Sequence, residues 1–380
     1  MNEEQRESTS EAGADKPLRL ALIVSEHTVL EYSISLERLL VGLADESIPV
    51  ALVCPPSCNM DTVISGAVEV IRHPVIDLPL IGRINRKELV EQLIKFKPDI
   101  IHCMCESKAG LTKQIARQLD VPYVLTVNSL QQRWKNFVCQ RQIHPLSISS
   151  NHCAKIIVPT KSIASNVAEI HPRFADRIEQ INVGTFVGER SVCFCELSQV
   201  PSMVIAHPFD NVDDFENLFG AVRHLTIDRH EFVTILMGSG RAERQIRRLL
   251  AALGLLQTVT IVPRLRPWRS VVGAGDIFIQ PAATAAFNPL LLEAMSVGAA
   301  VAGCKGGVDD LIIEEQTAVT FDPDDELSIY NSLKRLFGRR ELARKIARGA
   351  QEYLRQNNTV SNMITSTLRT YRDAVQWYIE

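Results

Sequence analysis

The chain has 380 residues, of which 46% are hydrophobic and 22% are charged, so it is long enough for two domains that each bury a core. A formal net charge of −3 argues against broad nucleic-acid binding, which needs a basic surface. The nine cysteines lack the repeated C-x-x-C spacing of a zinc module, which argues against a structural metal site and for reduced thiols.

The first 16 residues are polar and acidic, and they lack the apolar segment that is typical of a signal peptide. We expect residues 1–16 to form a disordered tail. No apolar run approaches the roughly 18 residues that a membrane span needs. We therefore expect a cytoplasmic protein without a transmembrane segment. The basic stretch Lys334–Arg348 is compatible with peripheral contact to an acidic membrane, although a solvated helix face is the simpler interpretation.

The first half of the chain alternates short apolar segments with segments of helical period, which predicts a doubly wound parallel sheet. The expected strands are Leu18–Val24, Val50–Cys54, Val68–Arg72, Asp99–Cys103, Tyr123–Val127, Lys155–Pro159 and Ile178–Asn182. The expected helices are Tyr32–Ala44, Arg86–Phe96, Gly110–Leu119, one that ends over Ser149–Ala154, and Ser162–Glu169.

The alternation stops over Gly184–Pro201, which we interpret as an inter-domain linker, and then starts again. Further strands are expected at Ser202–Ala206, Phe232–Met237, Val259–Val262, Asp276–Gln280, Ala299–Ala302 and Ala318–Phe321. Further helices are expected at Asp213–Leu225, Ala242–Leu253, Pro267–Gly273, Leu290–Val297, Asp325–Phe337, Arg340–Gln356 and Ser361–Ile379. The sequence thus predicts an α/β protein with two Rossmann-like domains, at residues 17–190 and 191–360, followed by a last helix at 361–380.

The loop Pro281–Pro289 is the best candidate for a binding site. It leaves the end of one expected strand and opens the helix that begins at Leu290. A helix start presents backbone N–H groups and a positive dipole end, which suit an anion. Ligands of open α/β sheets collect at this edge. Glu293 lies one turn into the helix, where its carboxylate could accept hydrogen bonds from sugar hydroxyls.

The segment FNPLLLEAM, from Phe287 to Met295, resembles the donor site of the retaining group 1 (GT4-like) glycosyltransferases. Members of that family carry two Glu residues separated by seven positions. Glu293 stands at the second of these positions, and Phe287 stands where the family has Phe. Ala285 replaces the first Glu, and Asn288 replaces a Gly. Weaker resemblance extends over nearly all of Leu18–Glu380.

The resemblance implies the GT-B architecture, in which two Rossmann-like domains face each other across a cleft and the last helix crosses back onto the first domain. It also implies a nucleotide-sugar donor, such as a UDP- or GDP-hexose, a glycan, lipid or small-molecule acceptor, and no metal cofactor. Glu293 would bind the ribose hydroxyls. The residues expected to hold the diphosphate are Phe287, Asn288, Pro289 and Leu290 through their backbone, with Arg264 or Arg241 and the turn at Gly238.

The chain departs from the family at several donor and catalytic positions. His207 and Val212 stand where the family has the Arg and the Lys that contact the donor, and of these two we keep His207 as a donor-binding candidate. Asn128 stands where it usually has a catalytic His, and the turn Ser25–Thr28 contains none of the family's glycines. On the same resemblance, Asn128 and His102 would face the acceptor.

Each candidate also has a simpler interpretation. Glu293 could be a surface residue of its helix, Asn288 an ordinary helix cap, and Arg241 part of a solvated face, while Gly238 could serve only the fold. His102 could be an ordinary loop histidine. Two functions from different classes therefore stay open: a nucleotide-sugar glycosyltransferase, and a catalytically inactive relative that acts as a binding or scaffold protein. A sugar-nucleotide epimerase of the same architecture lacks a supporting set of carboxylates and histidines.

Overall fold

The computed structural model describes residues 17–58, 68–74, 81–131, 134–135, 142–143, 148, 151–195, 200–262, 271–273, 275–304, 306–308 and 310–380. The chain divides into two compact units. The first comprises Met1–Val127, His144–Ile157 and Thr367–Glu380, and the second comprises Asn128–Ile143 and Val158–Ser366. Each unit is described by itself below.

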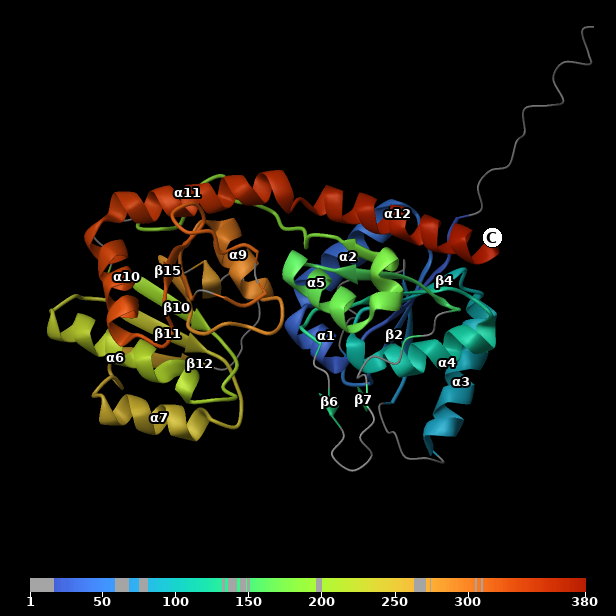
Figure 1. Cartoon of the computed structure of the whole chain (residues 1–380), viewed down its shortest axis with the longest axis horizontal. Helices are drawn as coiled ribbons and strands as arrows, with labels where there is room; N and C mark the ends of the chain where they lie inside the picture. The colour runs from blue at the N-terminus through green and yellow to red at the C-terminus, as the bar shows by residue number, and fades with distance from the viewer. Residues whose placement is uncertain are drawn as a thin grey trace, which may run out of the picture. The chain divides into compact units, whose positions relative to one another are not determined.

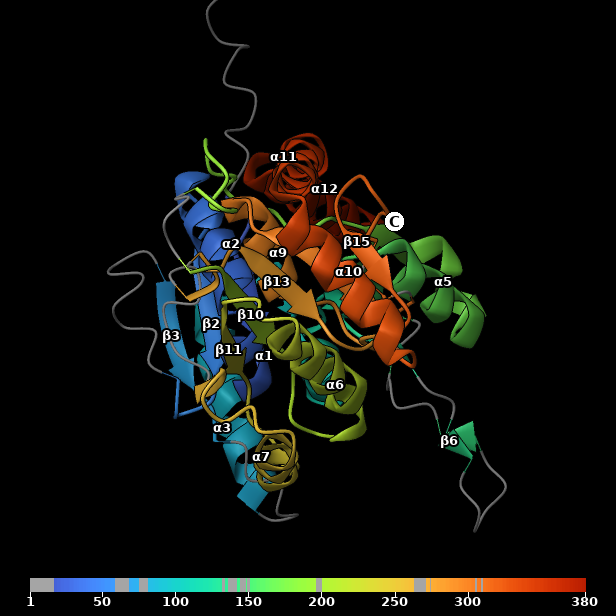
Figure 2. The ribbon, with the colours of Figure 1, turned by 90° about the vertical axis from the view of Figure 1, so that its left-hand side faces the viewer.

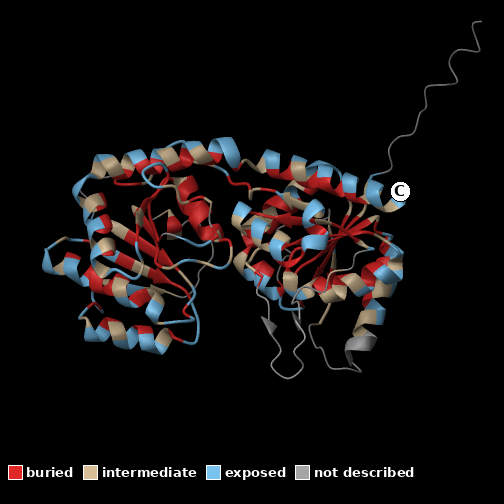
Figure 3. Ribbon diagram, viewed as in Figure 1, coloured by how far each residue is buried: buried red, intermediate tan, exposed pale blue. Residues whose placement is uncertain are grey.

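The first sheet has seven strands in the order β3-β2-β1-β4-β5-β8-β9. The strands are β1 (Leu20–Ile23), β2 (Val50–Cys54), β3 (Val68–Arg72), β4 (Ile100–Cys103), β5 (Tyr123–Thr126), β8 (Cys153–Val158) and β9 (Ile178–Gln180). Every residue of β1, β2, β4 and β5 is buried, as expected for strands of a parallel sheet that is covered on both faces (Figure 3). The register pairs Leu20 with Val50 on one side and with Ile100 on the other.

The helices that accompany this sheet follow the predicted alternation (Figure 1). They are α1 (Glu26–Glu31), α2 (Ser33–Asp45), α3 (Ile81–Phe96), α4 (Ala109–Leu119) and α5 (Lys161–Ile170), with 3-10 turns η2 (Glu106–Lys108) and η3 (Pro172–Arg177). A two-stranded antiparallel ribbon pairs β6 (Trp134–Lys135) with β7 (Gln142–Ile143).

Two local predictions in this half were wrong. Ser25 is the N-cap of helix α1, because its hydroxyl accepts the N–H of Thr28 (3.1 Å) and its own N–H donates to the Thr28 hydroxyl (3.4 Å). A capping box thus stands where the family has a glycine-rich turn. Further along, Cys153 and Ala154 belong to strand β8 and not to the end of a helix.

The second sheet has six strands in the order β12-β11-β10-β13-β14-β15, and all of its neighbouring pairs are parallel. Its strands are β10 (Ser202–Ala206), β11 (Val233–Met237), β12 (Val259–Val262), β13 (Ile277–Gln280), β14 (Ala300–Cys304) and β15 (Val319–Phe321). Its helices are α6 (Asp213–Ile227), α7 (Glu243–Ala252), α9 (Pro289–Val297), α10 (Glu326–Gly338) and α11 (Arg340–Asn357). Figure 2 shows α6 and α10 side by side against the strands. The helix expected at Pro267–Gly273 lies largely outside the described residues.

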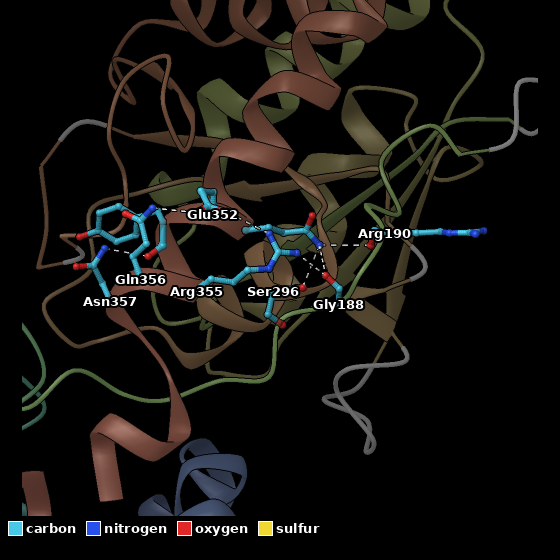
Figure 4. Close-up of polar contacts among 9 residues, drawn as sticks. Gly188, Arg190, Ser296, Glu352, Arg355, Gln356 and Asn357 are labelled. Atoms are coloured by element: carbon cyan, nitrogen blue, oxygen red, sulfur yellow. Dashed lines mark hydrogen bonds and ion pairs between the residues drawn. The ribbon is translucent and has the colours of Figure 1, made fainter. Parts of the chain in front are cut away.

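In the chain, the linker lies between the strands of the first sheet and those of the second. Its residues Gly188 and Arg190 are hydrogen-bonded to helix α11 of the second unit. Gln351 of α11 places its Nε2 atom 3.3 Å from the carbonyl oxygens of Gly188, Arg190 and Ser296, and Arg355 donates to the Gly188 carbonyl at 2.9 Å (Figure 4). A primary amide has only two N–H donors, so at least one N–H of Gln351 is shared between two of the three carbonyl oxygens. These contacts hold the linker residues against α11 and the end of α9.

The last helix, α12 (Val360–Ile379), contributes its residues from Thr367 onward to the first unit. Leu368, Tyr371 and Ala374 are buried there. The Tyr378 hydroxyl donates to Asp120 (2.6 Å), at the end of α4. Within the described part of the chain, none of the helices is both long enough and apolar enough to cross a membrane.

Candidate functional site

The start of helix α9 forms the centre of the candidate site in the second unit. Asn288 is its N-cap, since the side-chain oxygen accepts the N–H of Leu290 at 3.0 Å, and Pro289 occupies the first helical position. Gly298 ends the helix in the left-handed conformation, with a φ of 79°. All residues from Pro289 to Ser296 are buried, so α9 lies inside the unit on all sides.

Glu293 is therefore not a surface residue. It is 1% exposed, and its Oε1 accepts a hydrogen bond of 2.9 Å from the hydroxyl of Thr185. A buried carboxylate needs such partners because burial without them is strongly unfavourable. Thr185 was not a candidate from the sequence, since it lies 108 residues from Glu293 in a segment without a recognisable motif.

The turn Phe287–Leu290 does not present the expected row of free amides. The Phe287 N–H donates to the carbonyl of Asn128 at 2.9 Å, the Leu290 N–H is used by the cap, and Pro289 has no N–H. Three of the four positions expected to bind a diphosphate are thus engaged or lack a donor. The contact also places Asn128 beside this loop, next to the Ser129–Ala286 bridge.

Gln280 joins this group from the end of β13. It is completely buried, its Oε1 accepts from the Asn288 amide at 3.3 Å, and its Nε2 has no hydrogen-bond partner among the described residues. The sequence signal was a polar residue that ends the otherwise apolar strand IFIQ. A fully buried amide donor without a partner is unusual in a folded protein.

His207, at the position of the family's Arg, contacts an acidic side chain. Its Nε2 lies 3.2 Å from Asp214, and its buried Nδ1 has no partner within the described chain. Burial lowers the pKa of His207, although the Asp214 carboxylate opposes that shift. The ring packs edge-on against Phe215. Neither His207 nor Val212 has the permanent positive charge of the family's Arg and Lys.

The turn at Gly238 serves the packing of two loops. A Cβ on Gly238 would lie 2.2 Å from the His207 carbonyl oxygen, and one on Gly240 would lie 2.4 Å from the Phe209 carbonyl oxygen. The Phe209 ring is fully buried. Arg241 is exposed and donates to the Asp210 carbonyl at 3.2 Å. This geometry favours the structural interpretation of Gly238, while Arg264 lies outside the described residues.

His102, in the first unit, is a core residue. It is 2% exposed, and its two ring nitrogens lie 2.7 Å from the hydroxyls of Tyr371 and Thr126. Burial lowers the pKa of His102 to about 3, so the ring is neutral. The expectation that it faces an acceptor is wrong in this structure, because both ring nitrogens are engaged by hydroxyls within the core. His27 lies exposed on α1.

Asp310 was also missed by the sequence analysis. Its carboxylate accepts the N–H of Lys161 at 2.6 Å and the hydroxyl of Ser162 at 3.3 Å, at the start of α5. A carboxylate at a helix N-terminus compensates unpaired amides and the positive end of the dipole. It ties the loop after the Gly306–Gly307 turn to that helix.

These sheets, helices and connections define the GT-B fold of glycosyltransferases. A glycosyltransferase from Rickettsia africae ESF-5 superposes with a TM-score of 0.77 at 14% identity, over 95% of this chain and 99% of that one. The Anabaena Alr3699/HepE structure with UDP and glucose gives 0.75 at 14% identity, over 93% and 99%. At these identities the likeness shows the fold.

Sequence comparison gives the family. The family model described as Glycosyltransferase Family 4 matches residues 33–185, and that of Glycosyl transferases group 1 matches residues 202–339. The chain belongs to the group 1, GT4-like glycosyltransferases. Sulfoquinovosyl transferase SQD2 of Arabidopsis thaliana is 22% identical over 297 residues, which are 70% of this chain. The matched region spans about half (54%) of that relative's length.

Proposed function

We propose that the protein transfers a hexose from a nucleotide-sugar, such as a UDP- or GDP-hexose, to a glycan, lipid or small-molecule acceptor, with retention of configuration and without a metal cofactor. The observation that carries this proposal is Glu293. The chain keeps this carboxylate at the family's ribose position, buries it and gives it a dedicated hydroxyl partner in Thr185.

The proposed chemistry assigns separate tasks to the two ends of the donor. The Glu293 carboxylate accepts the two vicinal ribose hydroxyls and so holds the nucleoside. Leaving-group stabilisation is electrostatic, and it does not come from the N–H groups of Phe287 and Leu290, which are engaged within the chain. The Gln280 amide adds an unpaired donor next to the Asn288 cap. Asn128, which contacts this loop through its carbonyl, is the remaining candidate on the acceptor side.

Calorimetric titration without metal tests the donor site. UDP is the first probe, because similar structures contain UDP or UDP-glucose, and GDP and the corresponding sugar nucleotides follow. We expect micromolar binding of one nucleotide that Glu293→Ala abolishes. Glu231→Ala, at an exposed position of the same unit, is the matched control and should bind like the wild type. Absence of binding to every nucleotide at millimolar concentration would reject the proposal.

A catalytically inactive binding protein is the second candidate, and specific observations favour it. The family's Arg and Lys are replaced by His207 and Val212, and the amides of Phe287 and Leu290 are already engaged. Two lost charge-assisted hydrogen bonds cost on the order of 3–6 kcal/mol. Nucleotide binding without sugar transfer or donor hydrolysis, measured by release of nucleoside diphosphate, would support this candidate.

A further inference from the structure

The hydroxyl of Thr185 donates a hydrogen bond to the Glu293 carboxylate and so restricts its orientation. The two atoms lie 2.9 Å apart, and the two residues are 4% and 1% exposed. An O–H that donates to an ionised carboxylate makes a charge-assisted bond, which is stronger than a bond between neutral groups. Competition from bulk water is excluded by the burial of both side chains.

The backbone at Thr185 is itself fixed. Its N–H donates to the Asn358 carbonyl at 2.8 Å, and the Asn358 side chain donates to the Val183 carbonyl at 2.9 Å. A Cβ on Gly184 would lie 2.6 Å from Cα of Val360, so the chain can approach the start of α12 only with glycine there. As a β-branched residue, Thr185 also has a restricted χ1 angle. Its hydroxyl therefore points from a fixed position.

We infer that Thr185 is a positioning residue: it orients the Glu293 carboxylate to accept the vicinal 2′ and 3′ hydroxyls of the ribose of a nucleoside diphosphate. This inference rests on the proposed function. A carboxylate has about four acceptor sites, and Thr185 occupies one of them. Thr185 itself acts through Glu293 and does not contact the nucleotide.

This role has a specific consequence for ligand selectivity. An oriented carboxylate distinguishes ribose from 2′-deoxyribose, because the deoxy sugar leaves one buried acceptor without its donor. A carboxylate that has lost its orienting hydroxyl distinguishes the two sugars less. Binding of the base and the diphosphate does not depend on that hydroxyl. Removing the Thr185 hydroxyl should therefore reduce the ratio of the affinities for the ribonucleotide and the 2′-deoxyribonucleotide. A loss of protein stability alone, or a uniform loss of nucleotide affinity, would leave that ratio unchanged.

The test measures the dissociation constants of UDP and 2′-deoxy-UDP, and of GDP and 2′-deoxy-GDP, by calorimetry. We expect the wild type to prefer the ribonucleotide by about 10-fold or more. Thr185→Val, which keeps the shape of the side chain, should reduce that preference to roughly threefold or less. Thr185→Ser retains the hydroxyl and should restore it.

Thr317→Val is the matched control. Thr317 is also a fully buried threonine of the second unit, and its hydroxyl is hydrogen-bonded to the Leu311 carbonyl and the Ile313 N–H. This variant should lose stability but keep the ribose preference. If Thr185→Val does not fold, as judged by circular dichroism, Thr185→Ala and the Thr185→Ser variant supply the same comparison.

The outcomes separate the inference from the proposed function. Ribonucleotide preference that persists in folded Thr185→Val or Thr185→Ala would overturn the inference and leave the donor site in place. Wild-type binding without a ribose preference would also overturn it. Failure of the wild type to bind any of the four nucleotides would overturn the proposed function and the inference together.

Discussion

The imidazole of His102 lies 2.7 Å from the hydroxyl of Tyr371, although 269 residues separate them in the chain. This bond connects the end of strand β4 with the last helix, and both side chains are buried. The second ring nitrogen of His102 lies 2.7 Å from Thr126 on the neighbouring strand β5. His102, which the sequence analysis placed on the acceptor side, thus binds the C-terminal helix α12 to the sheet of the first unit.

Removing the Tyr371 hydroxyl should destabilise the first unit. Tyr371→Phe leaves a buried ring nitrogen of His102 without a partner, and we expect a loss of about 1–3 kcal/mol in the free energy of unfolding. Urea unfolding followed by circular dichroism measures it. Tyr378→Phe is the control on the same helix, because its hydroxyl contact with Asp120 is exposed. That variant should lose less than about 1 kcal/mol, and equal losses would contradict the buried role of Tyr371.

Acidification should destabilise the protein through His102. Burial lowers the pKa of the folded-state histidine from 6.5 to about 3, so the unfolded chain binds a proton that the folded chain does not. The contribution is fully present above about pH 7, declines below pH 6.5 and is lost as pH falls towards 3. Between pH 7 and 5.5 the loss should be about 1 kcal/mol.

Urea midpoints measured across this pH range test the linkage. His102→Asn should be less stable at pH 7 but should show a flatter dependence on pH. A residual slope of the same sign is expected from His207, whose pKa is also lowered by burial. An unchanged slope in His102→Asn would show that the histidine is not the titrating group.

A methyl group at Gly238 should disrupt the contact between two loops of the second unit. The added Cβ would lie 2.2 Å from the His207 carbonyl oxygen and 2.6 Å from the Phe209 ring. Relieving the first contact requires a shift of the backbone, which is more unfavourable than the rotation of a side chain. We expect Gly238→Ala to cost about 1–3 kcal/mol in the free energy of unfolding. Gly338→Ala is the control, since no atom of the described residues lies within 4 Å of its Cβ position, and thermal unfolding should show no loss there.

Asp276 should be required for the connection between the linker and the second sheet. Its carboxylate accepts the N–H of Phe194 at 2.5 Å and the N–H of Ser202 at 2.9 Å. Asp276→Ala leaves both amides without their acceptor, and we expect a loss of about 2–4 kcal/mol, measured by urea unfolding. Asp276→Asn, which keeps one carbonyl oxygen, should lose roughly half as much. The exposed Asp324→Ala should change stability by less than about 0.5 kcal/mol.

The alternation of apolar segments and helical periods was sufficient to predict both parallel sheets. Strands β2, β3, β10 and β12 begin and end at the predicted residues. The buried strands β2 and β10 were recognisable because such strands of a parallel sheet are short, apolar and bounded by polar or turn residues. The helix start at Asn288 and Pro289 was equally visible, since capping depends on residues that are neighbours in the chain. Glu293 was identified from its place one turn into that helix and from the resemblance of the segment to the family's donor site.

Tertiary structure alone decided what those residues contact. The sequence around these residues does not indicate that Thr185 donates to Glu293 or that the Asn128 carbonyl accepts the Phe287 N–H. Nor does it indicate the hydrogen bond between Tyr371 and His102. Each of these bonds joins segments that are brought together by sheet order and by the path of the last helix. Whether a polar side chain is exposed depends on burial by distant segments. The chain therefore specified its fold locally, whereas the availability of its polar groups was set by long-range packing.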